Sequence, residues 1–199
     1  MFKSVLITVL SESYSDAHKI AQQNAALPIE KGGLGLHANN TAMERAVAMG
    51  YTTHAYHGTG TDISAFSIKK AHDKEGMRLG LGLGHKKIYF STSATVASNW
   101  AGNSLKRKEN YGSGKSPQII PVLLKIKKPF SENEYLNHLY DNEDRERKNV
   151  INDLDKTLKN NGHDAIVGEH QIAVYHPNRI RSIHAAFDPM KKDSENILD

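Results

Sequence analysis

The feature that most limits the fold of this chain is a change of residue pattern at Tyr51. After this position, short strand-like runs alternate with irregular loops. The runs are rich in valine, isoleucine and tyrosine, which favour strands. Helical patterns interrupt them only at Ala94–Ala101 and Asn142–Asn160. Because helices do not alternate regularly with strands, the sequence predicts an α+β fold and not a doubly wound sheet. The predicted strands are His54–His57, Lys87–Ser91, Gln118–Lys125, Asp164–Val167, Gln171–Tyr175 and Arg179–His184.

The first fifty residues have a different, helical pattern. Tyr14–Leu27 is predicted to be a helix that stops before Pro28, and the capping-box pair Thr41 and Glu44 predicts a second helix up to Met49. The apolar run from residue 1 to 10 is short for a signal peptide, so we expect it to form a first strand or helix. The sequence thus predicts a helical segment at 1–50, one domain at 51–189 and a loose polar tail at 190–199.

Composition excludes several classes of function. The chain has 199 residues, of which 38% are hydrophobic and 24% charged, as in ordinary globular proteins. The absence of cysteine excludes disulfides and a cysteine nucleophile and suits the cytoplasm, and no apolar run approaches the ~20 residues of a membrane span. The eleven histidines show no metal-ligand spacing, so we expect no metal. A net charge of +4 with a pI near 9.1 permits an anionic partner such as nucleic acid.

Three short motifs each place polar residues at the edge of a strand-like run. The first, Ala55–Gly60 (AYHGTG), contains His57, Gly58 and Thr59. A glycine lets the backbone approach a ligand closely, while a histidine and a threonine can hydrogen-bond to the hydroxyls of a ribose. Such an arrangement is typical of a nucleotide site, although a strand that simply ends in a turn can have the same residues.

The second and third motifs add aromatic and amide side chains. In Lys87–Thr92 (KIYFST), the period of a strand directs Tyr89 to the face opposite its neighbours, and the only tryptophan, Trp100, follows eleven residues later. Both aromatic residues could equally belong to the core. The third motif, Glu169–Ile180 (EHQIAVYHPNRI), begins with a carboxylate and carries Gln171 at the edge of an apolar run.

Taken in order, these motifs resemble the histidine–tyrosine–glutamate branch of ADP-ribosyltransferases, which contains diphtheria toxin and the poly(ADP-ribose) polymerases. The resemblance covers about residues 51–189 and is greatest to the compact domains of prophage and mobile-element proteins. It implies a split β-sheet core and NAD as substrate. It also implies that His57 holds the adenosine ribose, that the backbone of Gly58 beside Thr59 grips the nicotinamide amide, and that Tyr89 and Trp100 enclose the nicotinamide ring.

The third motif departs from the family pattern, because Gln171 stands where the family has its catalytic glutamate. Glutamine keeps a hydrogen bond but carries no charge and cannot act as a base. Three interpretations follow: Glu169 supplies the carboxylate, the acceptor needs little assistance from a base, or the site binds NAD without consuming it. Since active transferases of the wider superfamily also carry other residues here, the resemblance favours an active enzyme.

The resemblance and the charge together give the functional hypothesis. The chain is expected to cleave NAD at the nicotinamide bond and to transfer ADP-ribose to RNA or DNA, which basic residues at Lys106, Arg107, Lys108 and Lys115 would contact. Because such an activity would harm its own cell, we expect a toxin of a toxin–antitoxin or phage-defence system, paired with a neutralising antitoxin protein. The alternatives are a protein acceptor, or a non-catalytic module that binds NAD or nucleic acid.

Overall fold

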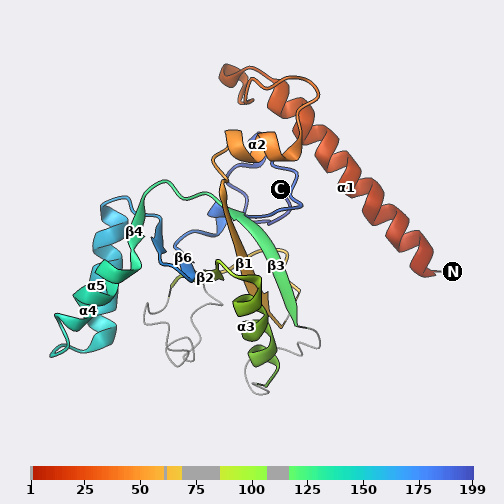
Figure 1. The fold of residues 1–199 in the computed structure, drawn as a ribbon. Helices are drawn as coiled ribbons and strands as arrows, with labels where there is room; N and C mark the ends of the chain where they lie inside the picture. The colour runs from red at the N-terminus through yellow and green to blue at the C-terminus, as the bar shows by residue number, and fades with distance from the viewer. Residues whose placement is uncertain (1, 61, 69–85, 107–116) are drawn as a thin grey trace.

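The structure, a computed structural model, describes residues 2–60, 62–68, 86–106 and 117–199, and the side chains of all of these except 2–13 and 103–106. Its centre is a seven-stranded sheet in the order β4-β5-β6-β2-β1-β3-β7 (Figure 1). The strands are β1 (Thr53–Thr59), β2 (Ile88–Ser91), β3 (Gln118–Leu124), β4 (Pro129–Ser131), β5 (Ala165–Val167), β6 (Gln171–Val174) and β7 (Ile180–Ser182).

The described residues also form five α-helices. These are α1 (Phe2–Ala26), α2 (Ala42–Ala48), α3 (Ala94–Lys106), α4 (Glu132–Tyr140) and α5 (Arg147–Asn160), with short 3-10 turns at Ile29–Lys31, Pro177–Arg179 and Pro189–Lys191. The α+β class is confirmed, and each of the six predicted strands is present. Helix α5 begins five residues later than expected, and both β4 and α4 were missed by the sequence analysis.

The sheet is nearly divided between β1 and β2. Strand β2 pairs along its whole length with β6, whereas in the described chain it pairs with β1 at one position, Tyr56 opposite Ser91. Strand β1 pairs instead along its whole length with β3. One half of the sheet is therefore β4-β5-β6-β2 and the other is β1-β3-β7, and the two meet at the strands that carry the first two motifs.

Alternation along the strands divides the core between the two faces of the sheet. One face carries Ala55, Phe90, Val122 and Ile172, which pack with Phe66 and with Ile197 from near the C-terminus. On the other face, α4 and α5 cover the β5–β6 half with a cluster that includes Ile166 and Ala173. Helix α3, which carries Trp100, packs on β1 and β3.

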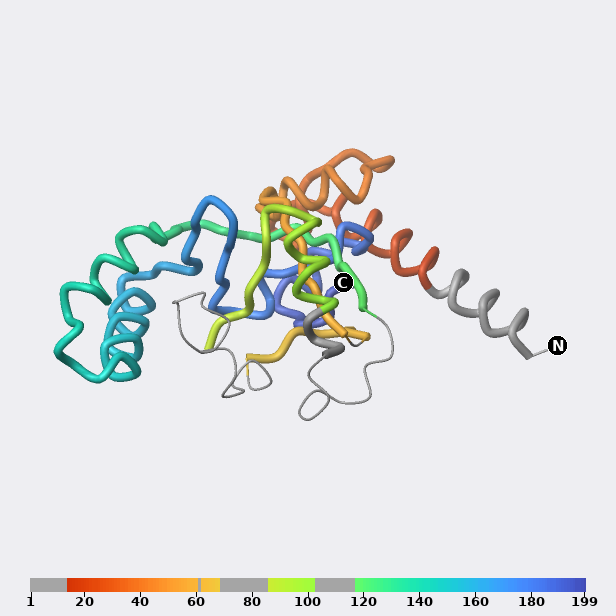
Figure 2. The backbone as a smooth tube through the Cα atoms, turned by 60° about the horizontal axis from the view of Figure 1, so that its bottom comes forward, coloured from red at the N-terminus to blue at the C-terminus, as the bar shows by residue number. Residues whose placement is uncertain are grey.

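Helix α1 contacts the rest of the molecule along its second half, beginning at Tyr14, whose hydroxyl donates to the backbone oxygen of His184 at 2.7 Å (Figures 1 and 2). There Ala21 and Ala25 are fully buried. The predicted helical character of the first fifty residues is confirmed. The expectation of a loose C-terminal tail is wrong, because Ile197 is only 4% exposed and its backbone N–H bonds to the carbonyl of Ser64.

Candidate functional site

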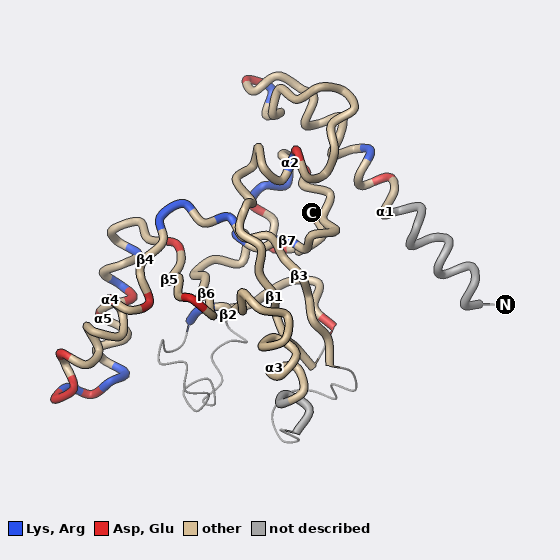
Figure 3. Tube along the Cα trace, in the orientation of Figure 1, with Lys and Arg blue, Asp and Glu red and all other residues tan. Residues whose placement is uncertain are grey.

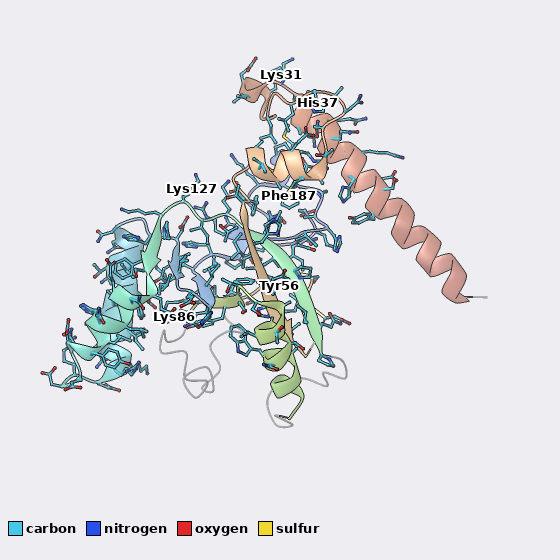
Figure 4. All side chains as sticks on the ribbon, viewed as in Figure 1. Lys31, His37, Tyr56, Lys86, Lys127 and Phe187 are labelled. Carbon is cyan, nitrogen blue, oxygen red and sulfur yellow. The ribbon has the colours of Figure 1, made fainter. Side chains whose placement is uncertain are left out.

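The three motifs come together because β6, β2 and β1 are neighbours in the sheet. Tyr56 lies opposite Ser91, and Ser91 lies opposite Gln171, so one row of residues crosses all three strands. Residues separated by more than a hundred positions in the sequence are thus brought to one place. Tyr56 on β1 and Lys86, two residues ahead of β2, mark this region in Figure 4.

His57 directly links the first motif to the second. Its Nδ1 lies 2.9 Å from the backbone oxygen of Tyr89, and because a carbonyl oxygen only accepts, Nδ1 carries the proton. The ring packs edge-on against Phe66, at 4.8 Å between centroids, and is tilted against Phe90 at 5.6 Å. Burial lowers the pKa of His57, an effect that the hydrogen bond to Tyr89 partly opposes. His57 is consequently neutral at pH 7, and its Nε2 is an acceptor.

The ring of Tyr89 lies on the opposite face of the sheet from that of His57. It is partly buried against the cluster formed by α4 and α5, and burial first, then the nearby Asp155, raise its pKa above the ordinary value. The two residues therefore share a backbone contact while their rings occupy different faces. The junction of β1 and β2, where the two halves of the sheet meet at a single residue pair, lies between the two rings.

Gly58 is in close contact with α3. A Cβ atom at this position would lie 1.9 Å from the backbone oxygen of Ala97 and 2.9 Å from the nitrogen of Ala101. The glycine therefore lets the helix rest directly on β1, a packing role that is separate from the predicted contact with the nicotinamide amide. Thr59 ends the strand and is 9% exposed. Trp100 is partly buried on α3.

Gln171 begins β6 and is 8% exposed. Its side-chain nitrogen donates to Oε1 of Glu132, the first residue of α4. Glu169, the carboxylate suggested by the sequence, lies instead in the turn before β6; its side chain is 87% exposed, and its Oε1 is 3.7 Å from His170. The structure thus brings Gln171 together with a carboxylate that the sequence analysis did not identify.

A local signal was available for the helix that carries Glu132. Ser131 followed by Glu134 is a capping pattern, and the Ser131 hydroxyl does accept from the Glu134 backbone N–H at 3.5 Å. That pattern would have placed Glu132 at the start of a helix. Its position beside Gln171 could not have been inferred in the same way, because it depends on the pairing of β4 with β5.

The predicted substrate-binding residues are largely outside the described part of the chain. Lys106 ends α3, but its side chain is not described, and Arg107, Lys108 and Lys115 fall in the range 107–116. Within the described residues, no three histidine, cysteine, aspartate or glutamate side chains are grouped so as to hold a metal ion. None of the described helices has the length and apolar character needed to cross a bilayer.

Comparison with known proteins agrees with this geometry. A family model described as ADP-ribosyltransferase in polyvalent proteins matches residues 48–187, which include all seven strands. No curated protein and no solved structure matches the chain. The matched range covers most of the sequence and contains each of the three motifs. The chain therefore belongs to the family of ADP-ribosyltransferases in polyvalent proteins, enzymes that use NAD as their substrate.

Proposed function

We propose that this ADP-ribosyltransferase breaks the nicotinamide–ribose bond of NAD and transfers the ADP-ribose to a nucleic acid, acting as a toxin that a partner protein neutralises. The observation that carries the proposal is the adjacency of β1, β2 and β6, which gathers His57, Tyr89 and Gln171 at the junction of the two halves of the sheet. No other group of polar residues in the described chain combines all three motifs.

In this proposal each residue acts on a different part of NAD. His57, neutral and protonated at Nδ1, accepts from a hydroxyl of the adenosine ribose through Nε2. Tyr89 and Trp100 contact the flat nicotinamide ring, where aromatic faces attract a cationic ring by ~0.5–2 kcal/mol each. Gln171 hydrogen-bonds to the ribose that bears the nicotinamide.

The transfer itself exchanges one bond for another. The bond between C1′ of the ribose and the nicotinamide nitrogen breaks, and its electron pair leaves with nicotinamide, which becomes neutral. The positive charge passes to the sugar, as in the hydrolysis of a glycoside. A lone pair of the acceptor then forms the new bond to C1′, and the acceptor's proton is lost to water.

A nucleic acid acceptor is supported by charge. The whole chain carries +4, and Lys86, two residues ahead of β2, is exposed. Figure 3 shows further basic residues in the connection from β3 to β4, while the turn between α4 and α5 is mainly acidic. A polyanion would be attracted to the first two regions and repelled by the third.

The acceptor can be identified by following the label. The full chain is incubated with a bacterial lysate and NAD labelled in its adenylate half, and portions are then digested with protease, RNase or DNase. We expect label that survives protease and is lost with one nuclease, and we expect no such label with His57→Ala. Label removed by protease alone would contradict the nucleic acid acceptor and favour a protein.

The toxin role has a separate test. Induced expression of the wild-type chain should arrest growth, whereas expression of His57→Ala to the same level should not. Equal growth of the two strains, with active enzyme in the lysate of the wild-type strain, would contradict the proposed toxicity. Saturable NAD binding without any release of nicotinamide would instead favour the non-catalytic module.

A further inference from the structure

The carboxylate of Glu132 is held against Gln171 by the way the edge strands pair. In the parallel pair β4–β5, Ser131 lies opposite Val167, and in the antiparallel pair β5–β6, Val167 lies opposite Ile172. The residue after Ser131 is therefore carried to the turn that precedes Gln171. As a result, the first residue of α4 meets the side chain that stands in place of the family's glutamate.

Gly168 provides a second, independent constraint on this carboxylate. A Cβ atom at position 168 would lie 1.6 Å from Oε2 of Glu132 and 3.0 Å from its Cβ. The side chain of Glu132 can occupy its position only because residue 168 has no side chain. One oxygen of the carboxylate thus lies against Gln171, and the other lies over the backbone of the β5–β6 turn.

The contact with Glu132 also fixes the orientation of the Gln171 amide. A carboxylate only accepts hydrogen bonds, so the nitrogen of the amide faces Glu132 and its oxygen faces away. Since Gln171 is 8% exposed, the amide has little freedom to turn over. A hydrogen bond to a charged acceptor also polarises the amide and makes its oxygen more negative.

We propose that Glu132 supplies, through Gln171, the negative charge that the glutamine lacks. The inference rests on the proposed function. As nicotinamide leaves, positive charge develops on the ribose; the polarised oxygen of Gln171 accepts from a ribose hydroxyl, and the carboxylate behind it stabilises the charge. Glu132 is thus a positioning residue that acts on the ribose by way of the amide. It replaces Glu169, whose carboxylate is directed toward His170 and solvent.

The decisive experiment moves the charge from one residue to the other. Glu132→Gln keeps the size and shape of the side chain, and the double variant Glu132→Gln/Gln171→Glu restores a carboxylate–amide pair with the partners exchanged. Nicotinamide release is measured to give kcat and the KM for NAD, together with thermal unfolding. The matched control is Glu134→Gln, which removes the same charge from the first turn of α4 at an exposed position.

We expect Glu132→Gln to lower kcat about 100-fold, the effect typical of a lost electrostatic contact to a developing charge, with little change in the KM for NAD or in the melting temperature. The double variant should recover activity to within about 10-fold of the wild type. Glu134→Gln should behave as the wild type. Gly168→Ala keeps both partners but displaces the carboxylate, so we expect it to lower kcat as well.

Two results would overturn the inference while leaving the proposed function intact. One is a Glu132→Gln enzyme with a kcat close to that of the wild type. The other is a double variant that is folded and no more active than Glu132→Gln. If the wild-type chain releases no nicotinamide from NAD, in the presence or absence of lysate, the proposed function fails and the role of Glu132 fails with it.

Discussion

At the scale of single residues, the state of His57 is set by its surroundings. The backbone oxygen of Tyr89 fixes the proton on Nδ1, while Phe66 and Phe90 exclude water from the ring. Desolvation disfavours the charged form and so lowers the pKa. The same burial that prepares Nε2 as an acceptor therefore makes the fold sensitive to acid.

This sensitivity can be measured with a His57→Gln variant. In the unfolded chain His57 takes up a proton near its ordinary pKa of 6.5, whereas in the fold it does so only at a lower pH. Its contribution to stability is therefore complete above pH 6.5 and is lost as the pH falls from there toward the folded-state pKa. We expect the unfolding free energy of the wild type to fall more steeply than that of the variant between pH 7 and 5.

The comparison between the two proteins is necessary because burial also lowers the pKa values of His18 and His176. Those two histidines are present in both proteins, and their effect cancels in the difference. Denaturant titrations at several pH values provide the measurement. Parallel curves for the wild type and His57→Gln would contradict a lowered pKa at His57.

The sequence predicted the strands that carry the motifs, but not the contacts that depend on distant pairing. His57, Tyr89 and Gln171 belong to recognisable strands, and these strands are neighbours in the sheet. Glu132 was missed because nothing near it in the sequence refers to Gln171, 39 positions away. Its place follows from the parallel pairing of β4 with β5, which no local pattern encodes.

At the scale of elements, a buried polar network attaches α4 and α5 to the sheet. Lys87, directly before β2, places its ammonium 2.5 Å from Asp155 on α5. The same carboxylate accepts from Tyr135 on α4 at 2.9 Å and from Tyr175 after β6 at 3.0 Å. Burial lowers the pKa of Lys87, and Asp155 opposes that change. One carboxylate thus links α5 to α4 and to the residues that flank β2 and β6.

Removing only one charge of the Lys87–Asp155 pair should lower the unfolding free energy more than removing both charges. Lys87→Met leaves Asp155 buried without its cation, so we expect a loss of about 3–5 kcal/mol in unfolding free energy. Lys87→Met/Asp155→Asn keeps an acceptor for the two tyrosines and should lose less than the sum of the single variants. A double-mutant cycle measured by denaturant unfolding gives the coupling.

A solvent-exposed ion pair between α5 and the turn that precedes it provides the control. Arg145 and Asp153 lie 2.7 Å apart, with side chains 46% and 64% exposed. Because water screens such a pair, we expect less than about 1 kcal/mol of coupling there. Equal coupling in the two cycles would show that burial of Lys87 and Asp155 does not strengthen their interaction.

At the scale of the whole molecule, α1 and α2 pack on the segment that follows β7, near the end of the family match at 48–187. Asn24 on α1 donates to both carboxylate oxygens of Asp188, at 2.9 and 3.1 Å. The buried Arg45 on α2 donates to the backbone oxygen of Ala186 at 2.8 Å. The sequence predicted the N-terminal helices but not these contacts, because they join residues 164 and 141 positions apart and leave no local pattern.

Ile197 and its neighbour Leu198 allow a matched test of the C-terminal segment. Ile197 is 4% exposed within the main core, whereas Leu198 is 46% exposed. We expect Ile197→Ala to lower the unfolding free energy by about 2–4 kcal/mol, and Leu198→Ala to change it by less than about 0.5 kcal/mol. Thermal and denaturant unfolding measure both. Equal, small effects would mean that the segment is as loose as its composition suggested.

The central position of β6 in the sheet has a consequence for the order of events during translation. Strand β6 is made after both β2 and β5, yet it lies between them in the sheet. A nascent chain that ends at residue 160 holds the first two motifs but lacks both β5 and β6. The three motifs can therefore come together only after residues 165–174 have been made, and every shorter nascent chain lacks the proposed site.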